Sequence, residues 1–133
     1  MTQHARGTFE VSMTPAAADD AAQDTSLGRF ILDKQFHGDL EATSRGQMLT
    51  AGAAVPNSAG YVAIERVTGT LAGRNGAFTL QHTGLMTRGA PELTIIVVPD
   101  SGADQLAGLA GSLTITNDAG AHSYDLAYTL PED

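Results

Sequence analysis

Apolar and polar residues alternate along most of the chain, with the period of two that is typical of half-buried β-strands. In the stretch 8–13, for example, Phe9, Val11 and Met13 fall on one side and polar residues fall on the other. Eight such stretches follow one another: 8–13, 29–36, 40–49, the two halves of 63–82, 92–98, 111–117 and 122–130. The pattern therefore predicts an all-β protein of about eight strands.

Most connections between these strands are short and fall at turn signals. Of the two longer ones, 14–24 is rich in Ala and Asp and suits a short helix or an ordered loop, and 99–111 is a glycine-punctuated loop with room for one helical turn. Eight meandering strands leave two exposed edges unless the sheet closes or stacks. We therefore expect residues 1–133 to form a single closed eight-stranded antiparallel up-and-down barrel, with a β-sandwich as the competing architecture.

The segment 63–82 has the pattern of a hairpin, and its register decides which polar side chains meet. Asn75-Gly76 is a strong signal for a two-residue type I′ turn, which places Gly69 opposite His82. One face of this hairpin is almost wholly apolar, yet it includes Glu65 and His82. At about 3.3 Å per residue, these two side chains would lie roughly 13 Å apart. The absence of a side chain at Gly69 would leave space over the imidazole for a ligand or a water molecule.

The same parity argument places further polar residues inside the barrel. With a short turn in the segment 37–40, Lys34 lies opposite Ser44 among aromatic and aliphatic neighbours. Tyr124 shares a face with the apolar residues of the last strand, and Tyr61 begins the apolar face of the hairpin. The predicted interior thus gathers these polar side chains: Lys34, Ser44, Tyr61, Glu65, His82 and Tyr124.

Glu65 has three interpretations. A buried carboxylate is costly unless it is paired or hydrogen-bonded, so the first is a structural pair with Lys34 or hydrogen bonds from Tyr61 or Tyr124. In the second, burial raises the pKa of Glu65, which then acts as a general acid or base. In the third, the register is wrong and Glu65 faces solvent.

The other interior residues also have both structural and chemical interpretations. His82 is either a proton shuttle or a core histidine satisfied by a hydroxyl group. Ser44 lacks the G-x-S-x-G turn of a nucleophilic serine, so we expect its hydroxyl group to serve Lys34. Tyr61 and Tyr124 are either core aromatics with a tethered hydroxyl group or part of the wall of a ligand pocket.

Composition narrows the classes of function. The chain has 7 Lys and Arg against 15 Asp and Glu, a net charge of −8, which argues against a nucleic-acid partner. It has no cysteine, so disulfides and thiolate chemistry are excluded. His82, His122 and Glu65 lack the spacing of metal-binding motifs, and no phosphate-loop motif occurs, so we expect neither a metal nor a cofactor.

The sequence also shows none of the usual patterns of a targeting signal. The N-terminal segment has no apolar run typical of a signal peptide, and the longest aliphatic run, 94–98, is too short to span a bilayer. We therefore expect a cytoplasmic protein without a membrane partner.

Several stretches together resemble a known family. "KQFHGDL", "GYVAIERVTGTLAGRNGAFTLQHTG", "VVPDSGADQLAGLAG" and "HSYDLAYTL" are similar to segments of the DUF3224 family of small bacterial proteins, from about Phe30 to Leu130. The family is similar in fold to the allene oxide cyclase barrel, so the resemblance implies an eight-stranded antiparallel barrel. It implies no activity, because the biochemical role of the family is unassigned.

Three functions are compatible with these observations. In the first, the barrel interior binds a small, largely apolar molecule through a few polar contacts, among them Lys34, Ser44, Tyr61 and Tyr124. In the second, the protein is a cofactor-independent isomerase or cyclase with Glu65 and His82 as catalytic residues. Glu65 would move the proton, and His82 or a tyrosine would stabilise the developing charge.

In the third, the core is filled and the protein acts through its surface or as a homo-oligomer. Val62 and Ile64 face outward in the predicted register, and together with the aliphatic run 94–98 they suit a contact between subunits.

Overall fold

The computed structural model describes residues 2–16 and 27–131, which form nine β-strands and no α-helix. The strands are β1 (Gln3–Pro15), β2 (Leu27–Gly38), β3 (Leu40–Gly52), β4 (Ala59–Leu71), β5 (Arg74–Thr87), β6 (Ala90–Val97), β7 (Ala103–Asp104), β8 (Ala110–Asp118) and β9 (Ala121–Thr129). No helix able to cross a membrane occurs in these residues. The eight longer strands correspond to the eight alternating stretches of the sequence, and β7 is a two-residue addition.

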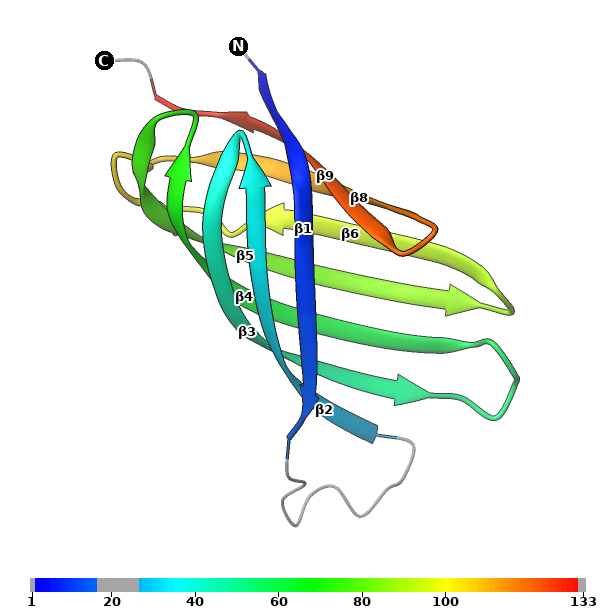
Figure 1. The fold of residues 1–133 in the computed structure, drawn as a ribbon. Coiled ribbons are helices and arrows are strands. Elements are labelled where there is room, and N and C mark those ends of the chain that lie inside the picture. The colour runs from blue at the N-terminus through cyan, green and yellow to red at the C-terminus, as the bar shows by residue number, and fades with distance from the viewer. Residues whose placement is uncertain (1, 17–26, 132–133) are drawn as a thin grey trace.

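The eight longer strands close into an antiparallel barrel (Figure 1). Neighbours pair in chain order from β1 to β6, β6 continues to β8, and β9 returns to pair with β1. The predicted closed up-and-down barrel is therefore confirmed. The closure is uneven, because β6 and β8 share a single ladder position, Ile96 with Ser112, whereas β3 and β4 pair from Leu40 to Gly52.

The predictions for the two longer connections have different outcomes. The prediction for 14–24 falls mostly outside the described residues, since only its first three residues are described and the first two of them end β1. The segment 99–111 forms no helix. It carries β7, which pairs with β5 at Gly76 and Ala77, and then tight turns that bring Leu106 and Leu109 into the core.

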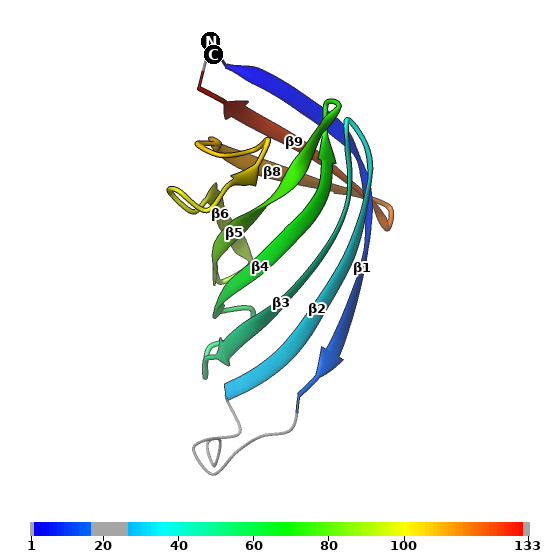
Figure 2. The ribbon, with the colours of Figure 1, turned by 90° about the vertical axis from the view of Figure 1, so that its left-hand side faces the viewer.

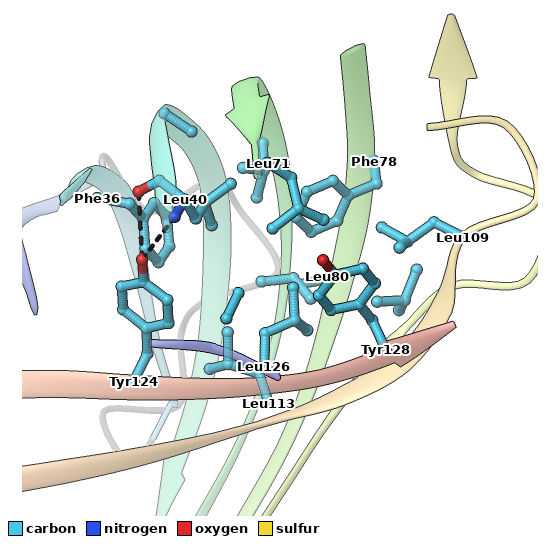
Figure 3. Close-up of a cluster of buried hydrophobic side chains, with 14 of the residues drawn as sticks. Phe36, Leu40, Leu71, Phe78, Leu80, Leu109, Leu113, Tyr124, Leu126 and Tyr128 are labelled. Carbon is cyan, nitrogen blue, oxygen red and sulfur yellow. Dashed lines mark hydrogen bonds between the residues drawn. The ribbon is translucent and has the colours of Figure 1, made fainter. Parts of the chain in front are cut away.

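One end of the barrel is filled with apolar side chains (Figure 3). Phe36, Leu40, Leu71, Phe78 and Leu126 come from both sides of the barrel, and none is more than 1 % exposed. Burying a side chain of this size stabilises the fold by about 1.5–3 kcal/mol relative to leaving it exposed. We call this the packed end.

The other end of the barrel is not filled in this way. β9 pairs with β1 only from Gln3 to Phe9, and the short strands β8 and β9 cover only part of the long strands β2–β5 (Figures 1 and 2). Beyond them, inward-facing apolar side chains stay in contact with solvent: Met13 is 50 %, Met86 42 % and Leu93 45 % exposed. We call this the open end, and its inner face carries Met13, Phe30, Met48, Tyr61, Met86 and Leu93.

The predicted turn between β4 and β5 at Asn75-Gly76 is wrong. The chain reverses at Ala72 and Gly73, whose φ angles of 47° and 85° are both positive, as a type I′ turn requires. Gly76 lies within β5, where a Cβ atom would stand 2.3 Å from the carbonyl oxygen of Ala103 in β7. This glycine therefore permits a close approach of two backbones rather than a turn.

The predicted faces of the same hairpin are nevertheless right. Gly69 pairs with a residue six positions before His82, so the register differs from the predicted one by an even number. Because side chains alternate with a period of two, an even shift leaves every residue on its predicted face. Glu65 and His82 accordingly point inward with 0 % and 4 % exposed, and Val62 and Ile64 point outward with 50 % and 49 % exposed.

Tyr124 faces the interior as predicted, and its hydroxyl group holds the β2–β3 turn. The hydroxyl accepts a hydrogen bond from the N–H of Leu40 at 2.9 Å and donates one to the carbonyl oxygen of His37 at 3.0 Å. Its ring packs edge-on against Phe36, with 5.6 Å between the ring centroids. The last strand is thereby tied to the first half of the chain at the packed end.

We expect Tyr124→Phe to lower the free energy of unfolding by about 1–3 kcal/mol, because it leaves the buried N–H of Leu40 without a partner. Tyr128→Phe is the matched control, since the Tyr128 hydroxyl makes one long hydrogen bond of 3.4 Å to Gln3. This control should change stability by less than about 0.5 kcal/mol. Urea unfolding measures both variants, and equal losses would contradict the role assigned to the Tyr124 hydroxyl.

Candidate functional site

Four polar side chains from four neighbouring strands meet on the inner face between the two ends of the barrel. Lys34 of β2 pairs directly with Ser44 of β3, as predicted. Glu65 of β4 pairs with Leu80, two residues before His82 on β5. Residues diagonal to each other on one face of a sheet are within reach of long side chains. We call Lys34, Ser44, Glu65 and His82 the polar cluster.

The polar cluster converges on the carboxylate of Glu65. Its Oε2 accepts hydrogen bonds from Lys34 Nζ at 2.8 Å and from His82 Nε2 at 2.6 Å, and its Oε1 accepts one from Ser44 Oγ at 2.8 Å. The predicted separation of Glu65 and His82 is therefore wrong, because it followed from the wrong turn. Ser44 serves Glu65 rather than Lys34, which also differs from the prediction.

The pKa of Glu65 is lowered, although its carboxylate is buried. Burial pushes this pKa upward, but the hydrogen bond from His82 and the positive charge of Lys34 outweigh burial and lower the pKa from 4.5 to about 2. Of the three interpretations of Glu65, the structural pair with Lys34 is confirmed, whereas the raised pKa and the exposed position are wrong. Glu65 is ionised at neutral pH. A carboxylate with so low a pKa is a weak general base.

The contacts of Glu65 also decide which nitrogen of His82 carries a proton. An ionised carboxylate only accepts hydrogen bonds, so Nε2 must carry the hydrogen that faces it. Nδ1 makes no hydrogen bond to a described residue, so no described donor engages its lone pair. It lies inside the barrel, because His82 faces inward and is 4 % exposed.

Tyr61 lies beside His82 on the side of the open end. It pairs with Gly84, two residues after His82, so Tyr61 and Glu65 flank the imidazole on opposite diagonals. The ring of Tyr61 lies over Gly84, where a Cβ atom would stand 2.1 Å from a ring carbon. Burial and, second, the negative charge of Glu65 raise the pKa of Tyr61.

The sequence did not identify Gly84 as a site residue, nor did it indicate that the inward apolar residues of the open end stay exposed. A glycine at an inward position of an otherwise regular strand is the signal for Gly84, because such a position often admits another group close to the backbone. Leu93 had no signal of its own, since its alternation is the same as that of a core residue.

Tyr124 and His122 do not join the polar cluster. The hydroxyl group of Tyr124 is bound to the β2–β3 turn, and His122 stacks on Phe9 with 5.1 Å between the ring centroids. Within the described part of the chain, no group of three His, Asp or Glu residues could hold a metal ion. Of the six predicted interior residues, four form the polar cluster, Tyr61 lies next to it, and Tyr124 lies apart.

A separate hollow of about 660 Å³ lies on the outer face of β1–β4. Arg66 lines it, as do Asp33 and Arg45, which form an exposed ion pair at 3.6 Å. Lys34 and Ser44 also border this hollow, but their side-chain polar atoms turn to Glu65. Exposed charges of this kind are ordinary on a protein surface, so we take the inner face as the candidate site.

Comparisons with known proteins agree on one family. Residues 5–128 match the family model of DUF3224, a protein of unknown function. The crystal structure of a protein of unknown function from the DUF3224 family of Shewanella oneidensis MR-1 is 45 % identical, covers 100 % of both chains and has a TM-score of 0.92. No curated protein matches the chain. The likeness to the allene oxide cyclase barrel stays a prediction.

The lowered pKa of Glu65 predicts how stability depends on pH. In the unfolded chain this carboxyl binds its proton near pH 4.5, whereas in the folded protein it stays ionised down to about pH 2. The unfolded state therefore binds more protons in this window, and the stability that Glu65 contributes above it is lost as the pH falls through it.

Glu65→Gln removes this dependence and leaves the other carboxyl groups in place. Between about pH 4 and 2.5 we expect the wild type to lose up to about 1.4 kcal/mol per pH unit more than the variant. Urea unfolding at a series of pH values measures the difference. Parallel curves for the two proteins would show that Glu65 is not held ionised by its neighbours.

Proposed function

The chain belongs to the DUF3224 family, as its sequence motifs predicted, and we propose that its barrel binds a small, largely apolar molecule at the open end. The observation that carries the proposal is the solvent exposure of apolar side chains on the inner face. Met13, Met86 and Leu93 face into the barrel but are 50 %, 42 % and 45 % exposed. Inward-facing apolar side chains that stay in contact with solvent are typical of concave binding sites.

The wall of the open end suits an apolar ligand. Met13, Met48 and Met86 supply flexible, polarisable thioether groups that adapt to the shape of a bound molecule. Phe30 and Tyr61 add flat aromatic faces to the same inner surface. Such a wall favours an unsaturated or aromatic molecule over a strongly hydrated one.

Two polar groups would fix the orientation of this molecule: the hydroxyl group of Tyr61 and Nδ1 of His82. The other predicted ligand contacts are less available, because Lys34 and Ser44 donate to Glu65 and Tyr124 is engaged at the packed end. The charge of Lys34 balances that of Glu65. We therefore expect a ligand without net charge.

A cofactor-independent isomerase or cyclase is the second candidate. It is favoured by the 2.6 Å contact between His82 and the ionised carboxylate of Glu65, because a carboxylate in this position orients an imidazole base. The roles differ from those expected at first, since Glu65 is too weak a base to move the proton itself.

Association with a second copy stays a prediction. The outer face of the barrel exposes Leu49, Val62, Ile64 and Leu85 by 55 %, 50 %, 49 % and 52 %. Single apolar residues on a surface are common, so a mass measurement in solution is the observation that decides between a monomer and an oligomer.

Leu93→Arg and Leu85→Arg form a matched pair of variants. Both leucines are about half exposed, at 45 % and 52 %, but Leu93 faces inward and Leu85 outward. We expect the neutral fluorophore phenylnaphthylamine to bind the wild type and the Leu85 variant alike. The Leu93 variant should bind at least about tenfold more weakly, a loss of about 1.4 kcal/mol, because a charge on the inner wall opposes an apolar ligand.

A fluorescence titration measures these affinities, and circular dichroism checks that both variants fold. The proposal fails if the wild type does not bind the fluorophore. It also fails if the Leu85 variant loses more affinity than the Leu93 variant.

A further inference from the structure

We propose that His82 transfers protons, and that its substrate is a neutral, largely apolar carbonyl compound with an acidic C–H next to the carbonyl group. This inference rests on the proposed function, because it requires a molecule bound at the open end. The arrangement of His82, Glu65 and Tyr61 on the inner face carries it.

His82 has the geometry of an oriented base. Its Nε2–H donates to the buried carboxylate of Glu65 at 2.6 Å, which leaves the lone pair on Nδ1, the nitrogen that no described residue engages. The carboxylate holds the orientation of the ring and stabilises the imidazolium ion that forms when Nδ1 takes up a proton. Glu65 is therefore a positioning residue, and His82 is the catalytic residue.

Tyr61 supplies the second group that the removal of such a proton requires. Negative charge develops on the carbonyl oxygen as the neighbouring carbon loses its proton, and a hydrogen-bond donor must face that oxygen. Tyr61 flanks His82 on the side opposite to Glu65, and its ring is fixed over Gly84. In the part of the chain that the structure describes, no hydrogen bond engages its hydroxyl group.

The groups around His82 favour a neutral substrate. Tyr61 and Glu65 of β4 lie next to His82 on the inner face, and Ile95 of β6 is the ladder partner of His82. Lys34 of β2 is linked to His82 through Glu65. Lys34 and Glu65 form an ion pair at 2.8 Å, so these side chains carry no net charge while His82 is neutral. A carboxylate or phosphate ligand would find no unpaired positive charge among them.

The reaction balances without a cofactor. Nδ1 takes the proton from the carbon next to the carbonyl group, the electron pair of the broken C–H bond forms the C=C bond of an enolate, and the carbonyl oxygen accepts a hydrogen bond from Tyr61. Return of the proton to the same carbon restores the substrate, and return to a conjugated carbon isomerises it. In D₂O the first path replaces C–H by C–D and releases HOD.

β-Tetralone, a small apolar ketone fused to a benzene ring, with acidic C–H bonds next to its carbonyl group, is the probe. Thermal shift and broadening of its proton signals measure binding, and loss of the signal of the protons next to the carbonyl group in D₂O measures exchange. We expect the wild type to bind the ketone and to accelerate exchange over buffer alone.

The variants separate binding from proton transfer. His82→Gln can still donate a hydrogen bond to Glu65, and we expect it to bind the ketone but to lose at least about 100-fold of the protein-catalysed rate. Tyr61→Phe should lose at least about tenfold. His4→Gln is the control, because His4 is an exposed histidine bound to Asp125, and its rate should equal that of the wild type.

Glu65→Gln tests the positioning role with a separate readout. We expect the dissociation constant of the ketone to stay the same and the exchange rate at saturation to fall. In ¹H–¹⁵N spectra of the wild type, the neutral ring of His82 should carry its proton on Nε2 only, and the variant should show both tautomers.

The outcomes distinguish the two proposals. Binding without faster exchange, or a wild-type rate in His82→Gln, overturns proton transfer and leaves the binding function standing. Absence of binding by the wild type overturns both. A wild-type spectrum with the proton on Nδ1 of neutral His82 overturns proton transfer even if one of the variants fails to fold.

Discussion

Burial of the Glu65 carboxylate is the constraint on which the rest of the barrel depends. A charge with 0 % exposure is tolerated only where donors reach it, and here they come from three other strands as Lys34, Ser44 and His82. A slip of one residue in any of these pairings would turn a donor to the outer face. We infer that the polar cluster selects one register for β2–β5, although the cost of removing charges from water offsets much of its attraction.

The polar cluster also divides the barrel into regions of different character. On one side, Phe36, Leu71, Phe78 and their neighbours fill the interior, because β8 and β9 close that half. On the other side, the inner face of β2–β5 keeps its apolar residues but is less well covered. Glu65, which accepts three hydrogen bonds, separates the two regions, and Tyr61 lies on the side of the open end.

Parity explains how much of this could be predicted from the sequence. The strands and the inward orientation of Glu65 depend only on alternation, which survives an even error in register. The closed barrel was predicted from the two exposed edges that eight meandering strands would otherwise leave. Contacts depend on the register itself, and the turn signal at Asn75-Gly76 pointed to the wrong one because Gly76 is needed for the close approach of β7. The lowered pKa of Glu65 was missed for the same reason, since its donors are identified only once the register is known.

The pairing of β1 with β9 delays the closure of the barrel until the last strand has been synthesised. Gln3 pairs with Tyr128, and contacts between such distant parts of a sequence form slowly because a long loop must be closed. The hairpins from β2 to β5 have short connections and can form as the chain emerges. Until β9 arrives, β1 is an open sheet edge with unpaired backbone groups, and a nascent chain is most prone to aggregate in this interval.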